Sequence, residues 1–138
     1  MKAGYRLTTD VGEIDHDVIS RWLEQESYWA AGRSRDEYDR SIAGSTLVVG
    51  ILTDEGATAG FCRVVSDQAT FAWLADVVVL PKHRGQGLGK ELVAAVVGHP
   101  VMRDVGRIVL GTKDAHGLYA QYGFEPVPDG RFMHRERA

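Results

Sequence analysis

The 138-residue sequence has little cysteine and no long apolar run. Its one cysteine, Cys62, cannot form an internal disulfide, which fits a reducing compartment. The most apolar segment, FAWLADVVVL, covers only residues 71–80 and includes Asp76, whereas a membrane-spanning helix needs about 20 apolar residues. The N-terminal stretch MKAGYRLTTDVGEIDHD has no apolar signal-peptide core. We therefore expect a soluble, cytoplasmic protein without membrane contact.

The sequence also lacks an excess of positive charge. It has 16 Lys and Arg against 19 Asp and Glu, a formal net charge of -3, and this argues against nucleic acid as a partner. Internal repeats, low-complexity tracts and Pro/Ser-rich linkers are absent, so residues 1–138 are predicted to form a single domain. The five histidines show no spacing typical of a metal site, and we expect no metal.

Hydrophobic periodicity predicts an α/β fold with a mixed, mostly antiparallel central sheet and flanking helices. Ser34 and Glu37 have the spacing of a capping box, and a crossover after the third meander strand predicts one locally parallel pair. The expected elements, in chain order, are strand Tyr5–Thr9, helix Ile14–Gln25, helix Ser34–Gly44, strands Ser45–Thr53, Ala57–Ser66 and Thr70–Leu80, helix Gly87–Val97, strand Arg107–Gly111, helix Ala115–Tyr122, and closing strands Phe124–Val127 and Arg131–Arg135.

The loop LPKHRGQGLGKELV, residues 80–93, carries three glycines and several cationic side chains between a strand and a helix. Unpaired backbone N–H groups at a helix start bind anions, and glycine lets the backbone approach the ligand closely. A Walker loop is excluded because Arg84 stands where its first glycine belongs and Glu91 follows Lys90. The G-x-G-x-G spacing also departs from the dinucleotide fingerprint G-x-G-x-x-G.

Two motifs in this sequence resemble one family. Arg84-Gly85-Gln86-Gly87-Leu88-Gly89 is similar to the R/Q-x-x-G-x-G/A signature of the GNAT superfamily of N-acetyltransferases. AHGLYAQYGF at residues 115–124 resembles the family's A-x-x-L-Y-x-x-x-G-F. The expected order of elements matches as well, so the resemblance covers nearly the whole chain. It implies the GNAT (acyl-CoA N-acyltransferase) fold and acetyl-CoA as the co-substrate.

The resemblance also implies which residues contact acetyl-CoA. In the family the loop wraps the pyrophosphate, and backbone N–H groups of the preceding strand bind the thioester oxygen. A bulge in that strand would leave such an N–H unpaired and splay the sheet. Thr112 stands where the family often has asparagine, and Asp114 is expected to cap the next helix. The matching positions are Val77, Val78, Val79, Arg84, Gly85, Gln86, Gly87, Leu88, Gly89, Lys90 and Thr112.

Two residues are candidates for proton transfer. By resemblance, Tyr119 protonates the leaving thiolate; the alternative is an aromatic packing role, since Tyr122 lies three residues on. Asp76 interrupts an apolar strand, and a buried carboxylate there is predicted to be functional or paired. General base, salt-bridge partner and binder of a cationic substrate are open readings for Asp76. A water relay competes with it as the base.

The acceptor site is expected around the link between the first two helices, which lines the acceptor pocket in the family. Tyr28, Trp29 and Arg33 lie in that link, and Phe71 and Trp73 alternate on one face of a strand, where they would form an aromatic wall. Core packing is the alternative for Phe71 and Trp73. Together with Asp76, these aromatic residues would suit a cationic amine through cation–π contacts.

The sequence thus predicts an acetyl-CoA-dependent N-acetyltransferase that acts on a primary amine, a small molecule rather than a protein, by direct attack in a ternary complex. The alternative is a non-catalytic acyl-CoA-binding regulatory domain of the same fold. A different acyl chain is a third reading, because the loop contacts only the phosphates of CoA. A homodimer is common in the family and is the prior for this chain.

Overall fold

The computed structural model describes residues 1–137 as five strands, four α-helices and three short 3-10 turns. The strands are β1 (Tyr5–Thr8), β2 (Leu47–Thr53), β3 (Thr58–Ser66), β4 (Ala72–Val79) and β5 (Ile108–Val109). The helices are α1 (His16–Glu26), α2 (Arg35–Ala43), α3 (Leu88–Val97) and α4 (His116–Ala120). No helix among the described residues is both long and apolar enough to cross a membrane.

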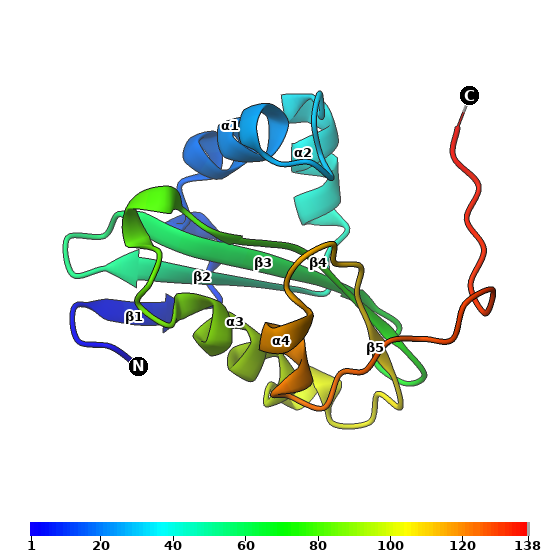
Figure 1. Cartoon of the computed structure of the whole chain (residues 1–138). Helices are drawn as coiled ribbons and strands as arrows, with labels where there is room; N and C mark the ends of the chain where they lie inside the picture. The colour runs from blue at the N-terminus through cyan, green and yellow to red at the C-terminus, as the bar shows by residue number, and fades with distance from the viewer. Residues whose placement is uncertain (138) are drawn as a thin grey trace.

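The sheet follows the order of the chain, β1-β2-β3-β4-β5. Strands β1 to β4 pair antiparallel, and β5 pairs parallel with β4. Helices α1 and α2 cover one face of the sheet, and α3 and α4 cover the other (Figure 1). This arrangement confirms the predicted mixed, mostly antiparallel sheet with flanking helices and the one parallel pair.

Each face of the sheet has its own hydrophobic core. Ile19 and Leu23 of α1 pack with Phe61 of β3 on one face. On the other face, Leu92 and Val93 of α3 pack against the sheet. The sheet therefore separates two cores, and the surroundings of a strand residue depend on which face its side chain reaches.

Local signals in the sequence position several elements correctly. The Ser34 Oγ atom accepts a hydrogen bond from the Glu37 amide at 3.1 Å, and the Glu37 carboxylate accepts one from the Ser34 amide at 3.0 Å. This is the predicted capping box at the start of α2. Thr53 and Ala57 close the β2–β3 hairpin through a 2.8 Å backbone bond, as the turn residues indicated.

The two predicted closing strands, Phe124–Val127 and Arg131–Arg135, are wrong. Neither segment forms a strand within the described residues, and Figure 1 shows the chain running away from the sheet after it passes β5. Pro126 and Pro128 lack the amide hydrogen that a ladder needs, and β5 offers only two residues to pair with.

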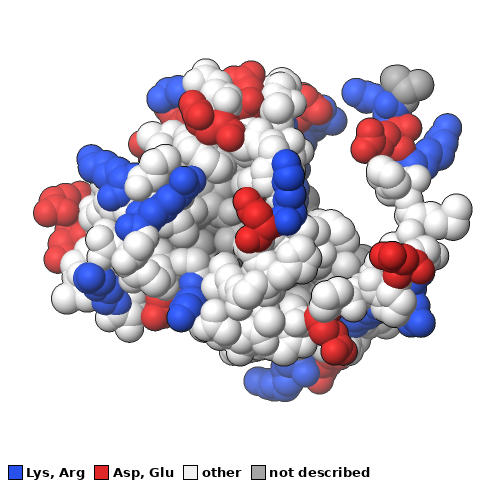
Figure 2. Space-filling model, viewed as in Figure 1, with Lys and Arg blue, Asp and Glu red and all other residues white. Residues whose placement is uncertain are grey.

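Charged side chains of both signs are interspersed on the face shown in Figure 2, without a broad basic field. Such a surface differs from the clustered Lys and Arg that phosphate-backbone binding requires.

Candidate functional site

The site is organised by an irregularity in β4. The register between β3 and β4 shifts by one residue between two flanking pairs, Phe61–Val78 and Arg63–Ala75. Cys62 alone therefore lies opposite both Asp76 and Val77, which is the two-against-one arrangement of a β-bulge. Asp76 adopts a left-handed backbone conformation, with φ 53°. The bulge thus lies next to Val77–Val79, the positions at which a bulge would free a backbone N–H.

The bulge decides which face Asp76 reaches. By simple alternation Asp76 would follow Ala72 and Leu74 onto the α3 face, where those two residues pack in the core. Instead its carboxylate meets Trp29 and Arg33 from the link between α1 and α2, on the opposite face. The extra residue thus reverses the side-chain alternation and brings a carboxylate out of an apolar core.

A first cavity of about 610 Å³ lies where α1 ends, between β4, α4 and the loop at residues 80–93, which we call the glycine loop. Its volume falls in the range of small-molecule sites. It is lined by Trp22, Glu26, Ser27, Tyr28, Trp29, Val77, Val78, Val79, Pro81, Arg84, Gly85, Gly87, Leu88, Gly89, Lys90, Asp114 and Leu118. All but two of the predicted acetyl-CoA-contacting positions are thus brought to one cavity, and the exceptions are Gln86 and Thr112.

The glycine loop presents free backbone donors to this cavity. Among the hydrogen bonds of residues 1–137, none uses an amide N–H of residues 85–90. Gly87 is the N-cap of α3, with φ 78° and no side-chain cap. The Arg84 Nε atom donates to the Val79 carbonyl at 3.0 Å, and its guanidinium lies 5.7 Å from the centre of the Trp22 ring. This combination of free amides, helix N-terminus and fixed arginine is suited to a phosphate group.

The backbone of Gly87 gives a first prediction. Replacing Gly87 with alanine adds a methyl group that meets nothing within 4 Å, so steric crowding plays no part. The positive φ alone should lower the free energy of unfolding by about 1–2 kcal/mol. Denaturant unfolding measures this loss, and acetyl-CoA titration should show a raised Kd. Gly117→Ala is the matched control, since its added methyl also meets open space but its backbone is helical.

An equal response of the two variants would contradict this account of the loop. Gly117→Ala should instead leave stability unchanged or raise it by about 0.5–1 kcal/mol, because alanine favours helix more than glycine does.

A second cavity, of about 760 Å³, lies beside the first. It is lined by Tyr28, Trp29, Arg33, Arg63, Trp73, Leu74, Ala75, Asp76, Val77, Leu110, Gly111, Thr112, Lys113, Asp114, Ala115, Tyr119 and His134. Four residues line both cavities: Tyr28, Trp29, Val77 and Asp114. We call these four residues the junction. Two ligands held in the two cavities would meet there, next to the bulge.

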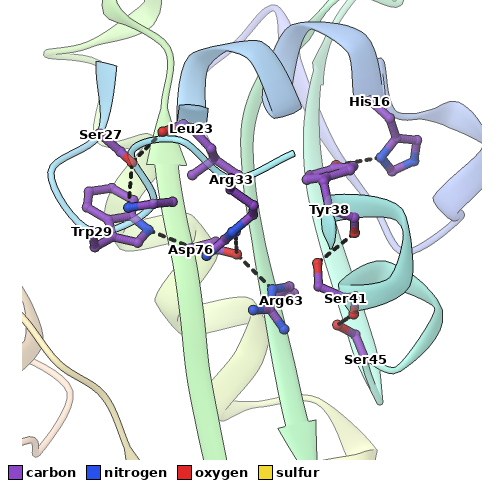
Figure 3. A network of polar contacts seen from close by, with 11 residues as sticks. His16, Leu23, Ser27, Trp29, Arg33, Tyr38, Ser41, Ser45, Arg63 and Asp76 are labelled. Carbon is purple, nitrogen blue, oxygen red and sulfur yellow. Dashed lines mark hydrogen bonds and ion pairs between the residues drawn. The ribbon is translucent and has the colours of Figure 1, made fainter. Parts of the chain in front are cut away.

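Asp76 is the centre of a buried polar network in the second cavity (Figure 3). Its Oδ2 atom accepts from Arg33 Nη1 and from Arg63 Nε, both at 2.7 Å, and its Oδ1 atom accepts from the Trp29 indole at 2.8 Å. Burial by itself would raise the pKa of Asp76, but the hydrogen bonds from the two arginines outweigh it and lower the pKa below its usual value. A carboxylate held in this way is a poor proton acceptor. The geometry favours the salt-bridge reading over the general base.

A contact across the junction links two loops that are far apart in the sequence. The Lys113 amide donates to the Tyr28 hydroxyl at 3.0 Å, and the Lys113 ammonium lies 5.4 Å from the centre of the Tyr28 ring. Tyr28 also packs edge-on against Trp29. The α1–α2 link and the segment between β5 and α4 are therefore joined where the two cavities meet.

Tyr119 is buried on α4 and faces the second cavity, while its neighbour Leu118 faces the first. Its ring packs against Phe124 with centres 5.9 Å apart. Burial raises the pKa of Tyr119 to about 12, so the phenol stays protonated at neutral pH. It can therefore donate a proton at the wall of the cavity. Tyr122 packs against the core and lines neither cavity.

The structure separates the other predicted acceptor residues. Trp73 lines the second cavity, whereas Phe71 lies in the β3–β4 turn outside both cavities, so the predicted aromatic wall is wrong for Phe71. The helix-cap prediction for Asp114 is wrong as well. The Thr112 hydroxyl accepts a hydrogen bond from the Ala115 amide at 3.0 Å, and the Asp114 side chain does not cap α4. Asp114 is left at the junction.

Two residues of the site were missed, Arg63 and Asp114. A signal for Arg63 was present, since it is the one charged residue in the apolar strand β3, as Asp76 is in the adjacent β4. Two lone opposite charges in neighbouring strands indicate a cross-strand ion pair. No group of three or more metal-ligating side chains occurs within residues 1–137.

Comparison with known proteins identifies the family to which this fold is similar. Residues 44–126 match the profile described as "Acetyltransferase (GNAT) domain". The crystal structure of a putative GNAT-family acetyltransferase from Xanthomonas campestris pv. campestris is 42% identical, with a TM-score of 0.90 over 96% of this chain and 93% of that one. A curated relative, the chloroplastic GCN5-related N-acetyltransferase 2 of Arabidopsis thaliana, is 36% identical over 99 residues, 71% of this chain.

A further relative, histone acetyltransferase TAP1 of Glycine max, is 39% identical over 72 residues, 51% of this chain. The matched regions make up 37% of the Arabidopsis protein and 31% of the Glycine protein, so the chain spans about a third of these relatives. The profile covers more than half of the chain, and the Xanthomonas structure matches almost all of it. The chain belongs to the GNAT family of acetyltransferases.

Proposed function

We propose that the protein transfers the acetyl group of acetyl-CoA to a primary amine of a small molecule, by direct attack. The observation that carries this proposal is the junction: a cavity with free loop amides and a second, chemically different cavity share Tyr28, Trp29, Val77 and Asp114. Residues 85–90 and Arg84 would hold the phosphates of acetyl-CoA, which supplies the acetyl group as an activated thioester. The acceptor would occupy the second cavity.

The reaction forms a carbon–nitrogen bond and breaks the carbon–sulfur bond, and a proton passes from the amine to solvent while the thiolate gains one. Backbone N–H groups beside the bulge are the expected donors to the thioester oxygen, because a bulge leaves its extra residue outside the ladder. The Tyr119 hydroxyl, protonated at neutral pH, is the proposed proton donor to the thiolate. Tyr119 therefore acts from its neutral, protonated form when it donates a proton to the thiolate.

Removal of the amine proton needs an acceptor other than Asp76, which is bound to two arginines. Asp114 lies at the junction and makes no ion pair with another described residue, so it can attract an ammonium group and pass its proton to water. A covalent acetyl-cysteine route is disfavoured, because Cys62 is fully buried and burial raises its thiol pKa to about 12. A single buried thiol fits a reducing compartment, and the cytoplasm is the place proposed for this reaction.

The protonation of Tyr119 gives a second prediction, on pH dependence. We expect kcat/KM to rise from about pH 7 to about pH 10, as the free amine fraction of an acceptor with an ordinary pKa increases. The Tyr119 pKa of about 12 means that the acid stays protonated over this range. Initial rates against pH with a saturating donor measure this profile. A loss of activity above about pH 8.5, without unfolding, would contradict the assignment of Tyr119.

The proposal is tested by thiol release from acetyl-CoA in the presence of amines of several classes: polyamines, amino acids, aminoglycosides and lysine peptides. We expect release that depends on both protein and acceptor, with a small molecule as the best acceptor. Binding of acetyl-CoA without release for any acceptor would favour the acyl-CoA-binding regulator instead.

A further inference from the structure

The second cavity carries more positive charge than the polar network neutralises. One carboxylate, Asp76, is bound by two guanidinium groups, Arg33 and Arg63. The Asp76 side chain is only 2% exposed, while those of Arg33 and Arg63 are 21% and 14% exposed. All three line the cavity. The network therefore leaves one net positive charge in a partly buried position.

The two arginines also have unused hydrogen-bond donors. A guanidinium has five N–H groups, and Arg33 uses only Nη1 and Arg63 only Nε in hydrogen bonds with described residues. Both donate to the same oxygen, Asp76 Oδ2, so the two guanidinium groups converge on one atom, as Figure 3 shows. No buried side-chain nitrogen or oxygen within residues 1–137 lacks a partner, so the unused nitrogens are accessible to solvent, and both arginines line the cavity. Paired arginines with free N–H groups match the oxygens of a carboxylate or phosphate.

The remaining charges of the cavity are unevenly placed. Lys113 also lines it and adds a third cationic side chain. Asp114 is the one carboxylate in its lining that has no ion pair within residues 1–137, and it lies at the junction with the first cavity. A purely cationic acceptor would place its charges against Arg33, Arg63 and Lys113. The distribution instead suits a molecule with an amine at one end and an anionic group at the other.

We propose that the acceptor is a primary amine that also carries an anionic oxygen group, a carboxylate or a phosphate, which binds the free N–H groups of Arg33 and Arg63 while the amine lies at the junction. This inference rests on the proposed acetyl transfer. It corrects the reading of Asp76 and the aromatic residues as a site for a cation, because the charge of Asp76 is already neutralised by the two arginines.

The first test compares acceptors that differ only in the anionic group. Free amino acids are compared with their carboxamides, and glucosamine 6-phosphate with glucosamine, by thiol release from acetyl-CoA; spermidine serves as the purely cationic probe. We expect the better pair to favour its anionic member by about tenfold or more in kcat/KM, the contribution of one or two hydrogen bonds to a charged group. A preference within the amino-acid pair would identify a carboxylate as the anionic group, and a preference within the glucosamine pair would identify a phosphate. Equal use of both members, or a preference for spermidine, would overturn the inference while leaving acetyl transfer intact.

Arginine-to-lysine variants test the assigned residues. Arg33→Lys and Arg63→Lys keep the positive charge beside Asp76 but remove the fork of donors. Each should lower the preference for the anionic acceptor about tenfold, measured as the ratio of kcat/KM between the two members of the responding pair. Arg35→Lys is the matched control: Arg35 is exposed, pairs with Asp17 and Asp39 on the surface and lines neither cavity. The same loss of preference in Arg35→Lys would contradict the assignment.

A binding measurement keeps the inference testable if no acceptor is turned over. The protein is first saturated with CoA, so that the glycine loop is occupied, and then titrated with acetate or inorganic phosphate while tryptophan fluorescence is recorded. Trp29 and Trp73 line the second cavity, and Trp29 contacts the network directly. We expect a saturable change that is weakened in Arg33→Lys and unaltered in Arg35→Lys. No saturable change in the wild-type protein would overturn the anion site.

Discussion

Replacing Asp76 with alanine is expected to lower the free energy of unfolding by about 3–5 kcal/mol, the usual loss when one partner of a buried ion pair is removed. The carboxylate neutralises Arg33 and Arg63 and accepts the Trp29 indole, so its loss leaves two adjacent guanidiniums facing each other. Alanine also tolerates the left-handed backbone at this position less well than aspartate does. Denaturant unfolding with linear extrapolation measures the change.

Asp76→Asn is the matched control, because asparagine keeps the shape and tolerates the backbone but removes the charge. It should lose less stability than Asp76→Ala, and its stability should respond less to acid. The folded-state pKa of Asp76 is lowered, so its contribution is present above the ordinary pKa near 3.8 and disappears as the pH falls through the folded value. A loss below about 1 kcal/mol in Asp76→Ala would mean that solvent satisfies the arginines and that the network contributes little.

Asp76→Asn also tests the hypothesis that Asp76 is the general base. If Asp76 were the general base, Asp76→Asn would change the apparent pKa of the pH–rate profile. We expect the profile of the remaining activity to keep the wild-type shape, since the base role is assigned to Asp114 and solvent.

Replacing Tyr119 with phenylalanine is expected to lower kcat about a hundredfold, because a positioned general acid contributes about 10²–10⁴ in rate. The ring that packs against Phe124 is retained, so stability should change little. Acetyl-CoA affinity should also be preserved, since Tyr119 does not line the first cavity. Steady-state kinetics and calorimetric titration separate the two effects.

Tyr122→Phe is the control for Tyr119→Phe. Both tyrosines pack against the same core, but only Tyr119 lines a cavity. A similar drop in kcat for both variants would assign the effect to packing, and no drop for Tyr119→Phe would remove this residue from the mechanism.

The parts of the fold that could be predicted are those specified by short stretches of sequence. The capping box of Ser34 and Glu37 needs only four residues, and the Asp54–Gly56 turn closes its hairpin locally. The first cavity was predictable for the same reason, because free amides at residues 85–90 follow from the local conformation of glycine at a helix start.

The parts that failed depend on distant partners or on register. Phe124–Val127 alternates like a strand, but the neighbouring β5 is too short to pair with it. The second cavity depends on the bulge at Asp76, since one extra residue in β4 moves that side chain to the other face of the sheet. Periodicity alone cannot place such an insertion. A salt bridge of Asp76 was among the hypotheses from the sequence, but Arg63, the one charged residue of the adjacent strand, was not identified as its partner.

In the proposed reaction, the acetyl group passes directly from acetyl-CoA to an amine across the junction. The most direct test is mass spectrometry of both protein and small molecules after incubation with acetyl-CoA and a mixture of free amino acids and amino-sugar phosphates. We expect an N-acetylated acceptor, free CoA in equal amount and a protein of unchanged mass. Bound acetyl-CoA with neither an acetylated acceptor nor free CoA, or a protein that carries the acetyl group itself, would contradict it.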